Sequence, residues 1–137
     1  MPRIRLTAGE HRFDFEVLED APRTAAWLAT LLPFTGELQH SMWSGETCIA
    51  GLAGDAPPLE TPMTSLYAGL LMVAPGADEG FTNAVLYVGY GSAELRGTRG
   101  RMFGTPVARL DGPTQTFRRA LSAARRGTVA MTVSVEG

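Results

Sequence analysis

The sequence predicts a single, mainly β domain, and three observations support this prediction. The chain has 137 residues, and domains commonly have about 100 to 150 residues. Glycine supplies 16 residues and proline 9, a combined share above the roughly 12% of an average protein, which favours a fold rich in turns. Polar and apolar residues alternate near both ends of the chain, as they do in strands with one buried face. We therefore expect one domain over residues 1–137.

The first two strands are expected to form a hairpin. Residues 3–7 and 11–17 alternate between polar and apolar types, and Ala8, Gly9 and Glu10 supply the turn between them. The alternation places one face of both strands in the interior. The side chains expected on that face are Ile4, Leu6, Phe13, Phe15 and Val17.

A helix is expected after the hairpin. Asp20 is a residue type that caps free amide groups, and Pro22 is tolerated in a first helical turn. The helix should stop at Pro33, because proline cannot continue it. Apolar residues at helical spacing indicate its buried side: Ala25, Trp27, Leu28, Leu31 and Leu32.

The middle of the chain predicts further strands. Two short ones, 38–43 and 46–52, are separated by Ser44 and Gly45, and the proline-rich residues 54–62 predict a loop that is the best candidate for a mobile flap. Apolar runs at 66–74 and 84–88 indicate central strands.

A turn is expected between these central strands, at 75–80. Residues 89–104 contain five glycines in sixteen residues, which we take as too many for a regular strand. Either the backbone there approaches another group closely or it turns sharply.

The last part of the chain predicts a strand within 102–110, a helix over 114–126 and a closing strand at 128–135. The helix has apolar residues on one side and arginines on the other, and Gly127 is a typical residue to end it. The expected inward side chains are Phe117, Leu121 and Ala124.

Composition excludes several kinds of chemistry. All 12 basic side chains are arginine, so a lysine Schiff base and a phosphate-loop lysine are excluded. Cys48 is the single cysteine, which excludes an internal disulfide and a multi-cysteine metal site. His11 and His40 are the two histidines, too few for a three-histidine metal centre. We expect no metal site, and we interpret Cys48 as a small buried hydrophobe rather than a catalytic thiol.

Charge and patterning also bear on partners. The formal net charge of −2 lacks the strongly basic character typical of nucleic-acid binding. The first residues lack the apolar stretch of a signal peptide, and no run approaches the about 20 apolar residues of a membrane span. No dinucleotide-binding or phosphate-loop spacing occurs, so we expect no cofactor. The resulting expectation is a cytoplasmic protein that binds neither nucleic acid nor membrane.

One group of candidate site residues lies within seven positions: His40, Trp43, Ser44 and Glu46. In the functional interpretation, Glu46 is an acceptor or base, His40 a donor or proton carrier, and Trp43 an apolar wall of a pocket. In the structural interpretation, Trp43 fills one end of the fold and His40 bonds to a turn backbone. The residues themselves do not decide between these interpretations.

A second group surrounds the glycine-rich residues 89–97. Here Tyr90 and Arg96 are the candidate ligand-binding residues, with Tyr87 and Glu94 beside them. Backbone amides and a nearby guanidinium can hold a carboxylate or phosphate. The alternative, which we favour, is a tightly curved corner whose glycines allow the curvature and whose arginines are solvated.

The beginning of the chain resembles the cyclophilins. In those proteins a strand like residues 12–17 leads to an acidic residue and then to a helix that opens as Ala21, Pro22 and Thr24 do here. A more specific resemblance is to a family of bacterial cyclophilin-like proteins of unknown function, DUF3830, and it covers most of the chain. Its blocks are Leu32-Pro33-Phe34 with Gly36, His40-x-x-Trp43-Ser44-Gly45-Glu46, Pro75-Gly76, Tyr90-Gly91-Ser92, and the spaced Gly100 and Gly104.

This resemblance implies a closed antiparallel β-barrel flanked by two helices. It does not imply prolyl isomerase activity, because cyclophilins place an arginine directly after the strand histidine and this chain has Ser41 there. The chain also departs from the family pattern at Thr105-Pro106, where an Asn-His-like pair is expected.

We therefore hypothesise a barrel that binds a small polar metabolite through His40, Trp43, Ser44, Glu46, Tyr90 and Arg96. Two alternatives stay open. One is an enzyme, either a hydrolase or isomerase with Glu46 and His40 as an acid–base pair or a residual prolyl isomerase. The other is a non-catalytic accessory subunit that uses the barrel surface as an interface, and a homo-oligomer is compatible with each hypothesis.

Overall fold

Eight strands close into an antiparallel barrel with two helices, which confirms the predicted fold class. The computed structural model of the chain describes residues 3–75, 83–97 and 100–136. The strands are β1 (Arg3–Ala8), β2 (His11–Val17), β3 (Phe34–His40), β4 (Gly45–Gly51), β5 (Ser65–Leu66), β6 (Leu70–Ala74), β7 (Val85–Glu94), β8 (Arg96–Gly97), β9 (Gly100–Arg101), β10 (Thr105–Leu110) and β11 (Val129–Glu136). The helices are α1 (Pro22–Thr30) and α2 (Gln115–Ser122), and α2 continues into the 3-10 turn η2 (Ala123–Arg125).

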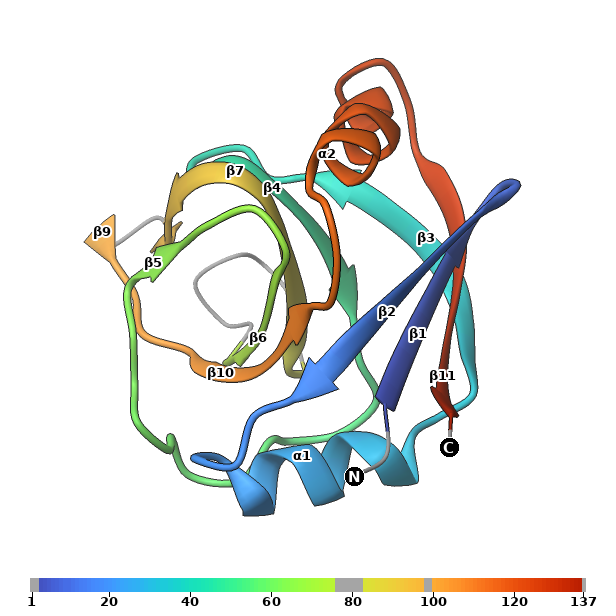
Figure 1. Cartoon of the computed structure of the whole chain (residues 1–137). Coiled ribbons are helices and arrows are strands. Elements are labelled where there is room, and N and C mark those ends of the chain that lie inside the picture. The colour runs from blue at the N-terminus through green and yellow to red at the C-terminus, as the bar shows by residue number, and fades with distance from the viewer. Residues whose placement is uncertain (1–2, 76–82, 98–99, 137) are drawn as a thin grey trace.

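The strand order explains the closure. Within the sheet the order is β4-β3-β11-β1-β2-β10-β6-β7-β5, and β4 also pairs with β7. Strands from the two ends of the chain meet because β11 pairs with both β1 and β3. Figure 1 shows α1 across one end of the barrel and α2 beside the other.

The main core fills the barrel. The inward side chains predicted for the opening hairpin are buried there, except that Val17 is only partly buried. Leu28 of α1, and Phe117 and Leu121 of α2, pack into the same cluster. Complete burial of an apolar side chain of this size contributes about 1.5 to 3 kcal/mol, so the two helices are held mainly by these contacts.

A second apolar cluster lies on the outer face of β6 and β7. Successive side chains of a strand alternate between faces, so Leu86, Val88 and Tyr90 belong to the barrel core whereas Val85 and Tyr87 belong to the outer cluster. The connecting segments around Leu66, Leu95 and Met102 complete that cluster. β7 is therefore buried on both faces, as its apolar sequence predicted.

The prediction that residues 89–104 contain no regular strand is wrong for their first part. β7 runs without interruption from Val85 to Glu94 and includes Gly89 and Gly91. Only the short strands β8 and β9 follow among the described residues of that segment.

Other predicted boundaries also shift. The strand expected at 38–43 is β3, which begins earlier and ends earlier. The run at 66–74 is divided into β5 and β6, because Gly69 has a φ of +95° that favours glycine and turns the chain. Apart from Pro75, the turn expected at 75–80 lies outside the described residues.

The loop expected at 54–62 is attached to α1 through Glu60. The Glu60 carboxylate accepts hydrogen bonds from the backbone N–H of Thr24 (2.7 Å), the hydroxyl of Thr24 (2.8 Å) and the N–H of Arg23 (3.3 Å). Asp20 was the expected cap, but α1 receives no side-chain cap from its own N-cap residue. Glu60 therefore satisfies amide groups that the helix leaves unpaired.

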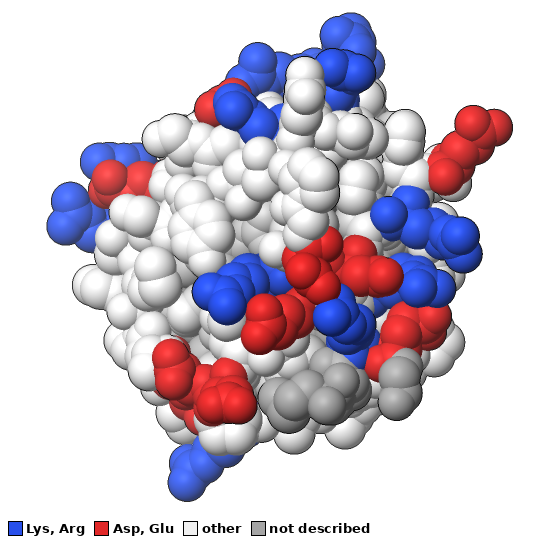
Figure 2. Space-filling model, in the orientation of Figure 1, with Lys and Arg blue, Asp and Glu red and all other residues white. Residues whose placement is uncertain are grey.

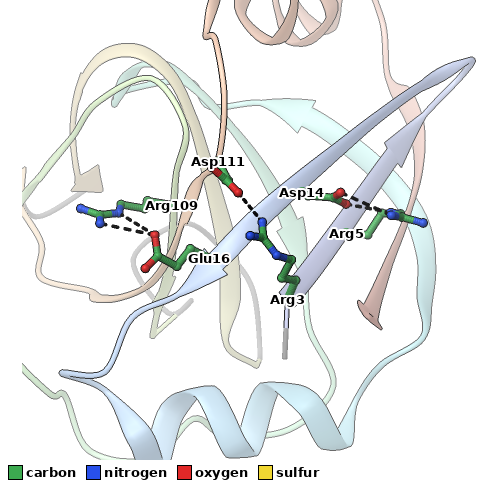
Figure 3. A network of polar contacts seen from close by, with 6 residues as sticks. All are labelled: Arg3, Arg5, Asp14, Glu16, Arg109 and Asp111. Atoms are coloured by element: carbon green, nitrogen blue, oxygen red, sulfur yellow. Dashed lines mark hydrogen bonds and ion pairs between the residues drawn. The ribbon is translucent and has the colours of Figure 1, made fainter. Parts of the chain in front are cut away.

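Ion pairs connect the outer face of β1, β2 and the end of β10 (Figure 3). On this side of the molecule acidic and basic side chains are interspersed (Figure 2). The three pairs drawn in Figure 3 are Arg3 with Asp111, Arg5 with Asp14, and Arg109 with Glu16.

Of the helices in the described residues, none has the length and apolar character needed to cross a membrane.

Candidate functional site

The candidate site is built around a β-bulge between β4 and β7. Gly45 pairs with Ala93 and Thr47 pairs with Gly89, and the register shifts between these two pairs. Glu46 therefore stands alone opposite the three residues 90–92 of β7. Bulges of this kind change the direction in which a side chain points and are common next to functional sites.

Two glycines allow other groups to approach the bulge closely. A Cβ at Gly91 would lie 2.4 Å from Oε1 of Glu46, and a Cβ at Gly89 would lie 2.8 Å from the carbonyl oxygen of Tyr67. This agrees with one of the two explanations given for the glycine-rich segment, close approach of the backbone. It also explains how a regular strand can contain both glycines.

The Glu46 carboxylate accepts two hydrogen bonds and has one further ion-pair partner, from two parts of the chain. The backbone N–H of Ser92 donates to Oε1 at 3.2 Å. Nη2 of Arg125 lies 3.4 Å from Oε2, and Nη2 of Arg118 lies 4.0 Å from Oε1. We refer to the Ser92 N–H, Arg118 and Arg125 as the donor cluster. Anion binding by backbone amides and Arg96 was the less favoured interpretation of this segment; here a backbone amide and two other arginines contact a carboxylate, and that carboxylate is the protein's own.

His40 and Tyr90 form a hydrogen-bonded pair at the inner side of the bulge. Nδ1 of His40 lies 2.8 Å from the carbonyl oxygen of Ser41, and Nε2 lies 2.8 Å from the Tyr90 hydroxyl. A carbonyl only accepts, so Nδ1 carries the hydrogen and Nε2 of the neutral ring accepts from Tyr90. Burial raises the pKa of Tyr90, although Arg125 acts in the opposite direction.

Within the described residues, His40 and Glu46 bind separate partners and make no direct contact with one another. Arg125 contacts a partner of His40 and also Glu46 itself. Its guanidinium carbon lies 5.7 Å from the centre of the Tyr90 ring, and its Nη2 pairs with the Glu46 carboxylate. Among the contacts of the described residues, none joins His40 directly to Glu46. The two groups are connected only through Tyr90 and Arg125.

Ser44 and Arg96 lie together, but the serine has a structural task. The Ser44 hydroxyl is buried, accepts from the backbone N–H of Arg96 at 3.1 Å and donates to its carbonyl at 3.3 Å. The guanidinium of Arg96 pairs with Glu94 at 3.2 Å, and Arg101 reaches the same carboxylate at 3.2 Å. Ser44 thus fixes the start of β8, and Arg96 remains half exposed.

Trp43 is 43% exposed, so the interpretation that it fills one end of the barrel is wrong. Its side chain borders a surface groove that continues past the bulge. One half of the groove has a volume of about 370 Å³ and the other about 390 Å³, and the two halves share Leu66 and Ser92. Trp43, Ser44, Gly45, Ser65, Ala93, Glu94 and Arg96 line the first half, and Glu46, Tyr67, Ala68, Gly91 and Arg118 line the second.

The structure therefore divides the six predicted site residues. Trp43, Ser44, Glu46 and Arg96 border the groove, whereas His40 and Tyr90 lie behind it and line neither half. Sequence reasoning did not assign Tyr67, Ser92, Arg118 or Arg125 to the site. The arginines on one side of the last predicted helix were the available signal, because Arg118 and Arg125 are two of them.

Cys48 lies on β4 and faces the barrel core. Its thiol is buried and donates a weak hydrogen bond to the carbonyl of Leu121 at 3.5 Å. Burial raises the pKa of Cys48 to about 12. The thiolate is the reactive form of cysteine, so this environment suits the predicted structural role and not a nucleophile.

The residues that the structure describes include no group of three or more histidine, cysteine or acidic side chains that could hold a metal ion. His11 is exposed at the start of β2, where its ring stacks on Phe13 at 5.9 Å.

Comparison with known proteins bears on the fold and the family. Among curated proteins none matches this chain. A solved structure, that of McbB in complex with tryptophan, superposes with a TM-score of 0.66 at 14% sequence identity. The alignment covers 96% of this chain and 44% of McbB, so the chain spans less than half the length of that protein. At this identity the likeness concerns the fold alone.

The family model of the proteins of unknown function DUF3830 matches residues 4–135. That match covers nearly the whole barrel, including β4, β7 and the groove between Trp43 and Tyr67. The motifs around His40 and Tyr90 had indicated the same relationship. This chain belongs to the DUF3830 family.

Proposed function

We propose that this protein binds a small polar metabolite with a carboxylate or amide group in the groove between Trp43 and Tyr67, and that it does not isomerise prolyl bonds. The observation that carries the proposal is the combination of two exposed aromatic side chains with polar groups along two neighbouring hollows that share Leu66 and Ser92. Small-molecule sites commonly join an apolar wall to a few well-placed polar groups.

The polar groups of the groove suit a ligand that both donates and accepts hydrogen bonds. The hydroxyls of Ser65 and Ser92 are on exposed residues, and the ion pair of Glu94 with Arg96 lies in the first half of the groove. Glu46 and Arg118 lie in the second half. An amide or carboxylate can meet donors and acceptors in either half, while an apolar part of the ligand contacts an aromatic ring.

The absence of isomerase activity is supported by the position that follows His40. Ser41 is buried, and its hydroxyl accepts a hydrogen bond from the backbone N–H of Ser44 at 3.3 Å. It therefore has a local structural task, and it offers no guanidinium to a prolyl amide. The acid–base alternative has less support, because His40 and Glu46 each bind separate partners.

A thermal-shift screen of amides, ureas, lactams and carboxylic acids tests the proposal, with tryptophan included because a protein of the same fold binds it in its solved structure. A ligand at ten times its Kd stabilises the folded state by about 1.4 kcal/mol, which raises Tm by about 4 to 6 °C for a domain of this size. A prolyl-peptide isomerase assay completes the test, and clear activity would contradict the second part of the proposal.

Two variants test whether a compound that raises Tm binds in the groove. Trp43→Ala should remove most of the shift caused by the ligand, whereas Phe103→Ala should keep it, since Phe103 is a similarly exposed aromatic residue that does not line the groove. Equal responses of both variants, or no hit across the screen, would count against groove binding.

A further inference from the structure

The donor cluster has the composition of a carboxylate-binding site. A backbone N–H and two guanidinium groups converge on one position at the mouth of the second groove half. Charge-assisted bonds between nitrogen and carboxylate oxygen are about 2.7 to 2.9 Å long when well formed. The corresponding distances to Glu46 are 3.2, 3.4 and 4.0 Å. The donor cluster therefore holds the Glu46 carboxylate only loosely.

Solvent exposure and charge both favour replacement of the Glu46 carboxylate by a carboxylate from solution. The Glu46 side chain is 33% exposed, and those of Arg118 and Arg125 are each 54% exposed, so their attraction is weakened by water and salt. The donor cluster carries two positive charges and Glu46 one negative charge, which leaves one positive charge uncompensated among these groups. A second carboxylate is therefore attracted to the cluster from solution.

The bulge also gives the Glu46 side chain room to leave. Its carboxylate lies against Gly91, where a Cβ would approach Oε1 to 2.4 Å, so the backbone of Gly91 forms one side of its surroundings, and its side chain is 33% exposed. Glu46 and Arg118 both line the groove half that also contains Tyr67 and Ser92. A ligand seated there meets the donors from the open side.

We propose that Glu46 is an internal competitor for a carboxylate-binding site, and that the carboxylate of the groove ligand replaces it on the Ser92 N–H, Arg118 and Arg125. The inference rests on the proposed groove binding and adds to it the charge of the ligand and the point at which that charge is held. It predicts that removing the negative charge of Glu46 strengthens the binding of carboxylates relative to the binding of neutral amides.

Benzoate and benzamide are suitable probes, because they share a ring for Trp43 or Tyr67 and differ in charge. Amide chemical shifts of isotope-labelled protein report on Ser92 and Gly91, and a titration yields the Kd of each probe. Glu46→Gln should lower the Kd of benzoate by about two- to fivefold, the effect expected for one like charge at a solvent-screened site. Arg125→Gln should raise it by a similar factor. Both substitutions should change the Kd of benzamide by a smaller factor than the Kd of benzoate, because the amide carries no charge.

Matched controls are available on α2 and on β3, the strand next to β4. Arg119→Gln changes an exposed arginine of α2 that does not line the groove, and Glu37→Gln changes an exposed glutamate of β3. Both should leave benzoate binding as in the wild type. Glu46→Gln preserves the size of the side chain, and Glu46→Ala provides a second variant whose benzoate Kd should also fall.

The outcomes separate this inference from the proposed function. Benzoate binding that is unchanged or weaker in both Glu46 variants would overturn the exchange. Insensitivity of benzoate to Arg118→Gln and Arg125→Gln would overturn the carboxylate site while leaving groove binding intact. Benzoate binding that appears only after Glu46→Gln would support the exchange, with Glu46 blocking the wild-type site. No binding of either probe to any variant would overturn the inference, and the wider screen would then judge the proposed function alone.

Discussion

Nε2 of His40 accepts a hydrogen bond from the hydroxyl of Tyr90 across 2.8 Å, and the two residues are fifty positions apart in the chain. The bond joins the end of β3 to the bulge in β7. It also places the phenol beneath Arg125, whose guanidinium reaches the Glu46 carboxylate. His40 therefore supports the groove from behind, although it does not line it.

Tyr90→Phe should reduce the free energy of unfolding by about 1 to 2 kcal/mol, because His40 loses the donor to its Nε2 in a largely buried place. Urea denaturation measures this change. Tyr67→Phe is the matched control, since Tyr67 is 48% exposed and its hydroxyl can be hydrated, so its effect should be near zero. Equal stabilities of Tyr90→Phe and wild type would show that the bond contributes nothing to stability.

The two glycines of the bulge should respond differently to alanine. In Gly89→Ala the new Cβ meets a backbone oxygen of Tyr67 at 2.8 Å and the Cβ of Leu66 at 2.9 Å, and such overpacking costs about 1 to 3 kcal/mol. In Gly91→Ala it meets Oε1 and Cδ of Glu46 at 2.4 and 2.7 Å, which can rotate away, and the Glu46 Cβ at 3.0 Å, which is a milder contact, so the loss should be smaller than for Gly89→Ala. Thermal or urea unfolding of both variants checks the order, and a larger loss for Gly91→Ala would contradict the geometry.

Cys48 should be unreactive in the folded protein. Its pKa is raised to about 12 by burial, so almost no thiolate exists at pH 8 and the group is inaccessible. Addition of a thiol-reactive disulfide reagent at pH 8 should give no signal until denaturant is added, and then one equivalent. Rapid labelling of the native protein would show that the β4 region opens or that the thiol is activated.

The contact of Glu60 with α1 should make stability depend on pH. Desolvation raises the pKa of Glu60, but the hydrogen bonds from Thr24 and Arg23 outweigh it, and the net result is a pKa below the usual value of 4.5. A lowered pKa means that the stabilisation is fully present above about pH 4.5 and is lost as pH falls through the pKa of the folded state.

Unfolding of wild type and Glu60→Gln between pH 7 and pH 3 tests this dependence. Glu60→Gln should be the less stable protein at pH 7, and the difference should narrow as the carboxylate becomes protonated. Other acidic groups, such as Asp14 beside Arg5, titrate in both proteins and cancel in the comparison. A difference that stays constant over the whole range would contradict an ionised cap.

Local patterns were sufficient for much of the fold. The opening hairpin, the first helix and the closing strand were predicted because alternation and helical spacing directly reflect which face is buried. The glycine-rich end of β7 was misjudged because the reason for its glycines is tertiary. Gly89 makes room for Leu66 and Tyr67, and these neighbours are not visible in a local pattern.

The candidate site was predicted only in part for the same reason. The motif from His40 to Glu46 correctly indicated a polar region, but the bulge sends Glu46 outward while His40 bonds to Tyr90. Arg125 takes part through a contact 79 positions away in sequence. The loop residue Glu60 replaced the expected cap Asp20, again through a contact between distant segments.

The central claim is that the groove between Trp43 and Tyr67 is the binding site. A crystal structure of the protein with the strongest compound from the screen tests it most directly. The account predicts the compound in this groove, with its ring against one of the two aromatic side chains and its polar group near the Ser92 N–H. A compound bound elsewhere, such as the hollow beside His11 and Arg119, with the groove unaltered, would contradict it.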